Sequence, residues 1–249
     1  GRRLRRQLKR DQQLVRPWQR HCDRGTPGDE GQTLALKLEE VQQRMREVRE
    51  RLGKLEELGL EKRSRTDEDA RFLRCRQGKV LGYTAEVAVS EDHFIVAQRV
   101  TQNTNDNASL LPLVKAVEKN CRERPAKVLA DSGFYSNENV ERIQEAGIDA
   151  YVPDANLARE FKTGRRARTI GRNRVVNAAL KQMRRKLRSS QGRATYNRRK
   201  GLVEPVFGIL KAQRGMNGFR CRGLPKVATE FAFAVLAYNL RRLWKLTWA

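Results

Sequence analysis

The sequence predicts an α/β fold, with a mixed sheet flanked by helices and a helical segment at the N-terminal end. Apolar residues keep a heptad spacing over residues 34–55, which indicates a coiled coil or a helical hairpin. Two segments rich in β-branched and apolar residues, 82–89 and 94–101, are spaced as a β-hairpin. An apolar run at 128–130 then leads through a capped helix to a second strand at 150–152. Strand, helix and strand in this order form a βαβ unit with parallel strands, so the sheet contains both kinds of pairing.

The N-terminal part differs from the rest in pattern. Residues 1–26 are rich in arginine with little apolar periodicity, and we expect a helix of mixed character or a loose basic arm. The heptad seam that follows serves packing or self-association. We therefore expect one region at 1–63, made of the arm and the heptad helix, and an α/β region at 64–249. The seam consists of Leu34, Leu38, Val41, Met45, Val48, Leu52 and Leu55.

Charge is the strongest compositional signal. The chain has 249 residues with 53 Lys and Arg against 29 Asp and Glu, a formal net charge of +24. Such an excess predicts a polyanionic partner, and nucleic acid is the leading candidate. No apolar run approaches the roughly 18 residues of a spanning helix, so no membrane partner is expected. The four cysteines are far apart and form no CxxC pair, as in the reduced thiols of a cytoplasmic protein.

The basic residues concentrate at about 155–200, where sixteen Lys and Arg accompany a single acid, Glu160. Within this stretch an apolar stripe at helical spacing runs from Val176 to Leu187, and Arg184 and Arg185 lie off the stripe. A basic run is often only a solvated face. The ordered stripe favours a surface for the phosphate backbone of DNA. An RNA-binding protein remains an alternative, although only 6% of the residues are aromatic, which argues against single-strand recognition by stacking.

Two carboxylates stand out in this basic chain. Asp131 ends the strand at 128–130, where open α/β sheets place their sites, although alone it is equally well a turn or capping aspartate. Glu204 lies on a helix between Lys200 and Lys211, and alone it is an ion-paired surface residue. Phosphodiester cleavage with two metal ions needs carboxylates from separate elements. Together, the two acids fit such a site.

Several stretches resemble the DDE transposases of bacterial insertion sequences. They are Gly82-Tyr-Thr-Ala-Glu-Val-Ala-Val, Ala130-Asp-Ser-Gly-Phe-Tyr-Ser, Gly147-Ile-Asp-Ala-Tyr-Val-Pro, Arg199-Lys-Gly-Leu-Val-Glu-Pro-Val-Phe-Gly and Leu236-Ala-Tyr-Asn-Leu-Arg-Arg. The resemblance covers roughly residues 64–246 in the same order. It implies a ribonuclease H-like catalytic core with a basic helical insertion, which cuts transposon ends and joins them to target DNA. It also implies Mg²⁺ as cofactor, with Mn²⁺ as a substitute, double-stranded DNA as partner and a homodimer.

The resemblance assigns roles by position. Asp131 matches the second catalytic aspartate of the family and Glu204 its catalytic glutamate, and both would be metal ligands. Near Glu204 the family has a tyrosine, an arginine and a lysine that contact DNA, and Lys200 stands where the arginine would be. The DNA-binding residues that we expect are Tyr196, Arg199, Lys200, Lys211, Arg184 and Arg185.

The first catalytic aspartate of the family has no counterpart in a strand ahead of the heptad helix. Asp11 and Asp23 lie in arginine-rich surroundings, and Asp67 and Asp69 precede the first strand. We read the chain as an N-terminally truncated copy, in which Asp69 is a candidate substitute. The alternative to an active transposase is therefore a catalytically inactive, DNA-binding remnant of one.

Overall fold

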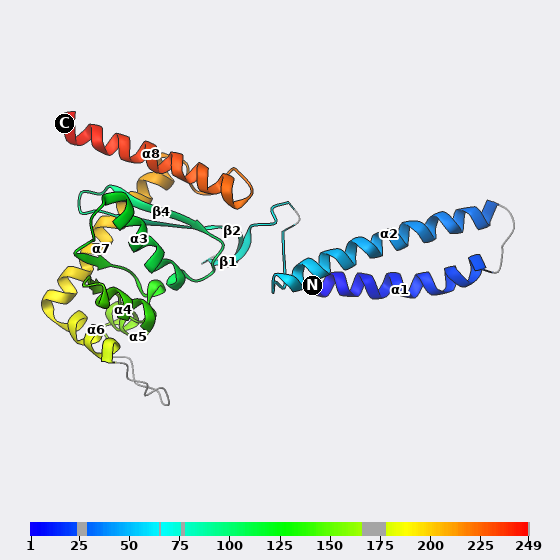
Figure 1. Ribbon diagram of the computed structural model, residues 1–249, viewed down its shortest axis with the longest axis horizontal. Coiled ribbons are helices and arrows are strands. Elements are labelled where there is room, and N and C mark those ends of the chain that lie inside the picture. The colour runs from blue at the N-terminus through cyan, green and yellow to red at the C-terminus, as the bar shows by residue number, and fades with distance from the viewer. Residues whose placement is uncertain (24–28, 65, 76–77, 166–177, 249) are drawn as a thin grey trace. The chain divides into compact units, whose positions relative to one another are not determined.

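The computed structural model describes residues 1–249 except 24–28, 65, 76–77, 166–177 and 249 (Figure 1). The chain divides into two compact units, Gly1–Thr66 and Asp67–Ala249. Within the described ranges, no helix is both long and apolar enough to cross a membrane.

The first unit is a helical hairpin of α1 (Arg2–Asp23) and α2 (Asp29–Glu57), which lie side by side in Figure 1. The heptad seam of α2 faces α1, and from Leu38 to Leu55 every seam residue is buried. Of the two structures that the seam allowed, the helical hairpin within one chain is therefore confirmed. The arginine-rich segment is a helix rather than a loose arm. Its Leu4, Leu8, Val15 and Trp18 are half-buried along a heptad of their own.

Asp11 occupies the remaining position of that heptad and is only 3% exposed. The guanidinium of Arg44 on α2 donates to both of its oxygens, at 2.8 and 3.1 Å. A charged residue inside an apolar seam is tolerated when it is paired, and it favours one register of the two helices. Arg5 and Glu56 form a further ion pair between the helices at 2.9 Å.

The second unit is a mixed α/β structure that is mostly helical. Its strands are β1 (Arg71–Cys75), β2 (Gly78–Gly82), β3 (Thr84–Val89), β4 (Ile95–Thr101), β5 (Lys127–Leu129) and β6 (Asp149–Tyr151). The expected hairpin is confirmed as the antiparallel pair β3–β4, and the βαβ unit as the parallel pair β5–β6. The antiparallel hairpin of β1 and β2 was not predicted. In the described part of the chain these pairs form separate two-stranded sheets instead of one mixed sheet.

The helices of this unit connect and cover the strands. They are α3 (Leu110–Cys121), α4 (Asn137–Glu145), α5 (Ala155–Thr163), α6 (Ala178–Arg188), α7 (Ser190–Gly208) and α8 (Leu224–Trp248). Helix α4 starts where Ser136 Oγ accepts a hydrogen bond from the Asn139 amide, and the chain leaves it through Gly147 at a positive φ of 73°. Both ends agree with the capping pattern of the sequence.

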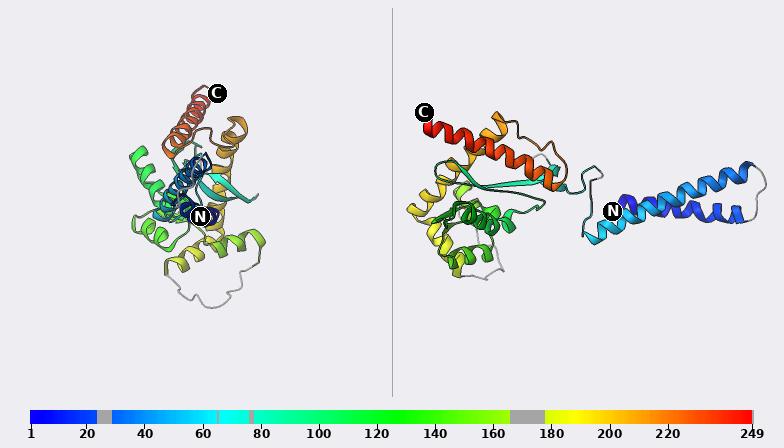
Figure 2. Two further views of the ribbon diagram at one scale, coloured as in Figure 1. Left: turned by 90° about the vertical axis from the view of Figure 1, so that its right-hand side faces the viewer. Right: turned by 45° about the horizontal axis from the view of Figure 1, so that its top comes forward.

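Two apolar clusters hold the unit together, and α7 takes part in both. One joins α4, β6 and α6 around Val140, Ile143 and Leu187, and Tyr196 of α7 packs against it. The other joins β4, α7 and α8 around Val206. Helix α8 lies along β4, as Figures 1 and 2 show, and its Asn239 side chain bonds the backbone of Ile95 in both directions, at 3.0 and 2.9 Å. The buried contacts at both ends fix α7 beside the end of β5.

Candidate active site

Asp131 lies where β5 ends and the short 3₁₀ turn η2 (Ser132–Phe134) begins. Its Oδ1 accepts a hydrogen bond from the Gly133 amide at 2.9 Å, so the carboxylate caps this turn. Its Oδ2 lies 4.0 Å from Nη1 of Arg199, and the side chain is 47% exposed. Asp131 therefore acts as a turn cap with one oxygen and leaves the other accessible.

A second aspartate, Asp106, lies next to it. It stands in the first turn of the 3₁₀ segment η1 (Asp106–Ser109), which leads from β4 into α3. A Cβ atom at Gly133 would lie 2.9 Å from Oδ2 of Asp106 and 3.1 Å from Oδ1 of Asp131. Burial raises the pKa of Asp106, and the charge of Asp131 raises it further. The two carboxylates thus face each other across a residue that has no side chain.

A third acid, Glu86 on β3, is close to Asp106. It is 4% exposed, and no side chain or backbone group of the described residues makes a hydrogen bond with either of its oxygens. Burial raises the pKa of Glu86; the Ser109 hydroxyl opposes the rise, while the negative charge of Asp106 adds to it. Arg99, directly opposite in the β3–β4 register, lowers the pKa, and its own Nη1 is buried without a hydrogen bond. Burial of this carboxylate therefore carries a free-energy cost that Ser109 and Arg99 offset only in part, since its pKa stays raised.

Helix α7 brings Tyr196 and Arg199 to Asp131. The Arg199 side chain is 20% exposed, and its guanidinium lies 5.6 Å from the centre of the Tyr196 ring. Burial raises the pKa of the Tyr196 hydroxyl; the charge of Arg199 lowers it and the charge of Asp131 raises it. Both expected DNA-binding residues therefore share the electrostatic surroundings of the expected catalytic aspartate.

Glu204 lies farther along the same helix. It follows Arg199 by five residues, a rise of about 7.5 Å along the axis. The side chain is exposed, and within the described ranges it makes no hydrogen bond or ion pair. Lys200 and Lys211 are also exposed, and Lys211 lies over the Phe207 ring at 5.7 Å. Glu204 and Lys200 are thus exposed on α7, and Lys211 is exposed just beyond its end.

The helix changes its geometry just past Glu204. Pro205 is inside α7 and has no amide hydrogen to donate to the preceding turn. The α-helix then continues as a π-helical turn, η3 (Ile209–Gln213), which contains Lys211. Turns of this kind are frequent at functional sites.

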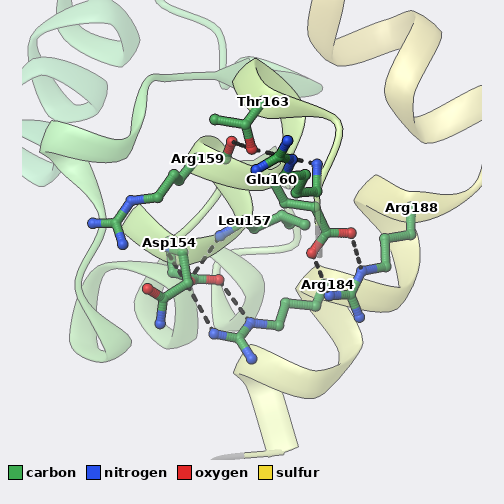
Figure 3. A network of polar contacts seen from close by, with 9 residues as sticks. Asp154, Leu157, Arg159, Glu160, Thr163, Arg184 and Arg188 are labelled. Carbon is green, nitrogen blue, oxygen red and sulfur yellow. Dashed lines mark hydrogen bonds and ion pairs between the residues drawn. The ribbon is translucent and has the colours of Figure 1, made fainter. Parts of the chain in front are cut away.

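The two expected DNA contacts on α6 differ in their surroundings, as Figure 3 shows for Arg184. Its guanidinium donates to both oxygens of the buried Asp154, at 2.8 and 2.9 Å. Burial alone would raise the pKa of Asp154, but the hydrogen bonds and charge of Arg184 more than offset this, and the pKa is lowered. Arg188 is similarly held by Glu160 at 2.8 Å, whereas Arg185 is exposed. Part of the apolar stripe, including Val176, lies outside the described residues.

The acids that precede the first strand have structural partners. Both oxygens of Asp67 accept from the Tyr83 hydroxyl, at 2.7 and 2.8 Å. Oδ2 of Asp69 accepts from the Leu224 amide at 2.9 Å, at the start of α8. The Asp69 carboxylate is therefore engaged in capping α8.

The donor set around Asp131 suits a hard divalent cation in part. In the described portion of the chain, no group of three or more His, Cys, Asp or Glu side chains converges on one point that could hold a metal ion. Asp106 and Asp131 nevertheless provide two carboxylates close to Gly133, where a Cβ atom would crowd an oxygen of each. Mg²⁺ is often bound through one or two carboxylates and keeps several waters. The residues present thus fit a cation with few protein ligands.

Neither curated proteins nor solved structures match this chain. A family model, described as "Transposase DDE domain", matches residues 60–240, which is well over half of the chain. This range contains Asp131, Glu204 and the basic helices around them. The chain belongs to the transposase DDE domain family.

Proposed function

We propose that this chain cuts DNA at the ends of a mobile element and joins them to target DNA, with Asp131 and Glu204 as its catalytic carboxylates. Membership of the family implies DNA transposition. The observation that carries the finer proposal is the position of Asp131. It ends a parallel strand, half exposed, with Tyr196 and Arg199 of a basic helix beside it. We also propose that the core is ribonuclease H-like and that the protein works in the cytoplasm on nucleoid DNA.

The proposed chemistry needs Mg²⁺ or Mn²⁺. When bound, such an ion activates water or a 3′-hydroxyl and stabilises the leaving oxygen of the phosphodiester. Asp131 offers Oδ2, because Oδ1 is engaged by the Gly133 amide. Glu204 offers an exposed carboxylate with no internal partner in the described residues. Arg199 would hold the scissile phosphate close to Asp131.

The proposed DNA path follows the open side of α7 and the exposed part of α6. Lys200, Lys211 and Arg185 are exposed there, as contacts to a phosphate backbone require. Because such contacts release counterions, binding is expected to weaken steeply with salt. A homodimer would bring two DNA ends together, and we propose it on the resemblance alone.

Nicking of a supercoiled plasmid by the whole chain tests this proposal. With Mn²⁺ present, we expect nicking that EDTA abolishes and that falls at least about a hundredfold in Asp131→Asn and in Glu204→Gln. Glu138→Gln, which changes an exposed acid on α4, is the matched control and should nick like the parent. Full activity in both of the first two variants would overturn the assignment of these carboxylates.

The second candidate function is DNA binding without cleavage. It is favoured by one observation, namely that no cluster of three metal-ligating side chains occurs in the described residues. The same assay separates the two candidates. A chain that binds plasmid DNA tightly at low salt but nicks none of it with either metal is a remnant, and it contradicts the catalytic proposal.

A further inference from the structure

Positive charge covers the side of α1 that is turned away from α2. Helix α1 has eight Lys and Arg residues against two acids. In the heptad set by its seam, which runs from Leu4 to Trp18, nine positions lie on the side opposite the seam. All nine are exposed, and seven of them are basic. This outer face of α1 consists of Arg2, Arg3, Arg6, Lys9, Arg10, Gln13, Arg16, Pro17 and Arg20.

The cations of the outer face have no acidic partner in the described part of the chain. Arg5, which pairs with Glu56 at 2.9 Å, lies beside the seam and not on the outer face. The buried Asp11 is taken up by Arg44 of α2. Among the described residues, none of the seven outer cations forms an ion pair with Asp or Glu. Their charge is therefore available to a partner from outside the chain.

These cations do not stabilise the helix that carries them. Helix α1 begins at Arg2 and has no acid in its first turn, so several basic side chains lie at its N-terminal end. Cations at that end oppose the helix dipole. Like charges four residues apart on one face repel each other, as Arg2 and Arg6 or Arg6 and Arg10 do. Residues that cost a local element stability in this way are expected at functional sites.

The other helix of the hairpin has a different outer face. The corresponding heptad positions of α2 carry five exposed acids and two exposed cations, and the acids dominate. Ion pairs within the helix, Arg51 with Glu47 at 3.3 Å and Lys54 with Glu50 at 2.6 Å, compensate part of the charge. Such a mixture is typical of a solvated face. The outer face of α1 lacks this mixture, so simple solvation does not account for it.

We propose that the outer face of α1 binds the phosphate backbone of duplex DNA. This contact is separate from the proposed DNA path over α6 and α7. The family match begins at residue 60, beyond both helices of the hairpin, so membership of the family assigns this face no role. The inference goes beyond the proposed function and depends on neither Asp131 nor Glu204.

The dimensions and residue types of α1 favour duplex DNA among the nucleic acids. The outer face extends from Arg2 to Arg20, about 27 Å along the axis. A helix fits the major groove of B-DNA, whereas the corresponding groove of A-form RNA is too narrow. Gln13 is of a type that can bond adenine in that groove. Trp18, the one Phe, Trp or Tyr of α1, is half-buried in the seam and is not placed to stack on single-stranded bases.

An anionic membrane surface fits α1 less well than DNA does. A helix that lies on a membrane inserts its apolar face between the lipids. In α1 that face is packed against α2, as Figure 1 shows for the two helices. Only charge is left for an external partner, and duplex DNA offers a negative charge about every 1.7 Å along its axis.

Binding of the whole chain to a short labelled duplex at several salt concentrations tests the inference. In the triple variant Arg3→Gln, Arg6→Gln, Arg10→Gln, the slope of log binding constant against log salt concentration should be smaller by about 3. The matched triple Lys37→Gln, Arg46→Gln, Arg49→Gln removes the same charge from exposed positions of α2 and should keep the parental slope. Equal slopes in the two triples would overturn the inference, because the chain would then respond only to its net charge.

A gain of binding separates a DNA contact from a loss of fold. Gln13→Arg adds a cation to the outer face of α1 and should raise the slope by about 1. Gln43→Arg adds one at the corresponding exposed position of α2 and should leave the slope unchanged. The triple variant of α1 should melt no lower than the parent, since Gln and Arg have similar helix propensities and repulsion at the helix start is relieved. A parental slope in Gln13→Arg would contradict the inference.

Two other partners would be revealed by the same variants. If an RNA hairpin bound more tightly than the duplex at matched salt, and the α1 triple lost that binding, the outer face would belong to RNA. If the parent formed dimers without DNA and the α1 triple did not, while its DNA slope stayed parental, the acidic face of α2 in a second copy would be the partner. Either result contradicts the assignment to duplex DNA.

This inference and the proposed function can fail separately. If the α1 triple lowers the slope while the parent never nicks DNA, the hairpin contact is supported and the catalytic function is not. If nicking depends on Asp131 and Glu204 while the α1 triple binds DNA like the parent, the catalytic function is supported and this inference fails.

Discussion

In the helical hairpin, Asp11 is 3% exposed and Arg44 donates to both of its oxygens, whereas in the second unit Glu86 is 4% exposed and has no hydrogen-bonding partner among the described residues. Both acids are buried to the same degree. Asp11 is fully paired by Arg44, whereas Ser109 and Arg99 compensate the charge of Glu86 only in part. The same contrast appears within the second unit, where Asp154 is held by Arg184.

The difference separates two uses of a buried carboxylate. A carboxylate paired with a guanidinium fixes how elements pack, because removing either partner leaves an uncompensated charge. A cluster in which like charges meet without enough partners is costly to the fold, and such clusters concentrate at functional sites. The hairpin acid is thus structural, and the acids around Asp131 are candidates for chemistry. The variants below test this contrast.

The largest effect is expected from breaking the satisfied pair. Arg44→Met should destabilise the hairpin by about 2 to 3 kcal/mol, since it leaves Asp11 buried without a partner. The expected value is below that for a fully buried pair because the Arg44 side chain is 48% exposed. Native-state hydrogen exchange of the α1 and α2 amides would report the loss. Arg49→Met, at an exposed position of α2, is the control.

The double variant sharpens this test. Adding Asp11→Leu to Arg44→Met should restore most of the lost stability, because an apolar pair then completes the seam. If the α1 and α2 amides of Arg44→Met exchange their hydrogens at the parental rate, the Asp11–Arg44 pair has no structural role. The contrast with Glu86 then disappears.

At Glu86 we expect the substitution to raise the stability of the fold instead of lowering it. Because burial raises the pKa of Glu86 above 4.5, the folded state favours the neutral form. The resulting penalty is absent below pH 4.5, grows as the pH rises through the raised pKa, and is complete above it. Glu86→Gln should therefore stabilise the metal-free second unit by about 1 kcal/mol at pH 7. It should have little effect at pH 4.

Urea unfolding at the two pH values, with EDTA present, measures this difference. Glu141→Gln, an exposed acid on α4, serves as the reference. A loss of stability in Glu86→Gln at pH 7 would mean that the carboxylate is satisfied after all, and that Asp11 and Glu86 play the same role.

The smallest effect separates the two neighbouring arginines of α6. Arg185→Ala should lower the slope of log binding constant against log salt concentration by about 1, because this exposed side chain can contact one phosphate. Arg184→Lys should leave the slope nearly unchanged, since the residue at 184 is committed to Asp154. Fluorescence anisotropy of a labelled duplex at several salt concentrations gives both slopes. If both variants lowered the slope equally, Arg184 would contact DNA in the complex instead of staying paired with Asp154.

Local pattern was enough to predict much of the fold. The hairpin of β3 and β4, the boundaries of α3 and the βαβ unit around α4 follow from turn residues, β-branched runs and caps. The seam of α1 was missed because Asp11 interrupts it, and an acid paired across helices cannot be recognised without its partner Arg44. The separate strand pairs were also not predicted, since pairing between distant strands depends on tertiary contacts.

The surroundings of the site were less predictable. Asp131 and Glu204 carry recognisable motifs, whereas Asp106 lies in a polar loop and resembles any acid at the start of a helix. Its proximity to Asp131 depends on Gly133 and on how η1 packs against η2. The sequence analysis did not single out Glu86, although an acid inside the otherwise apolar strand 84–89 is a signal that could have been used.

The hairpin of α1 and α2 has a consequence for assembly. Both halves of its seam belong to one chain, so the hairpin forms within a single molecule and its stability does not depend on protein concentration. Dilution should leave it folded, and a second chain could use the same seam only by exchanging one helix for its own. Any dimer that forms at low concentration must therefore be held together through another part of the surface.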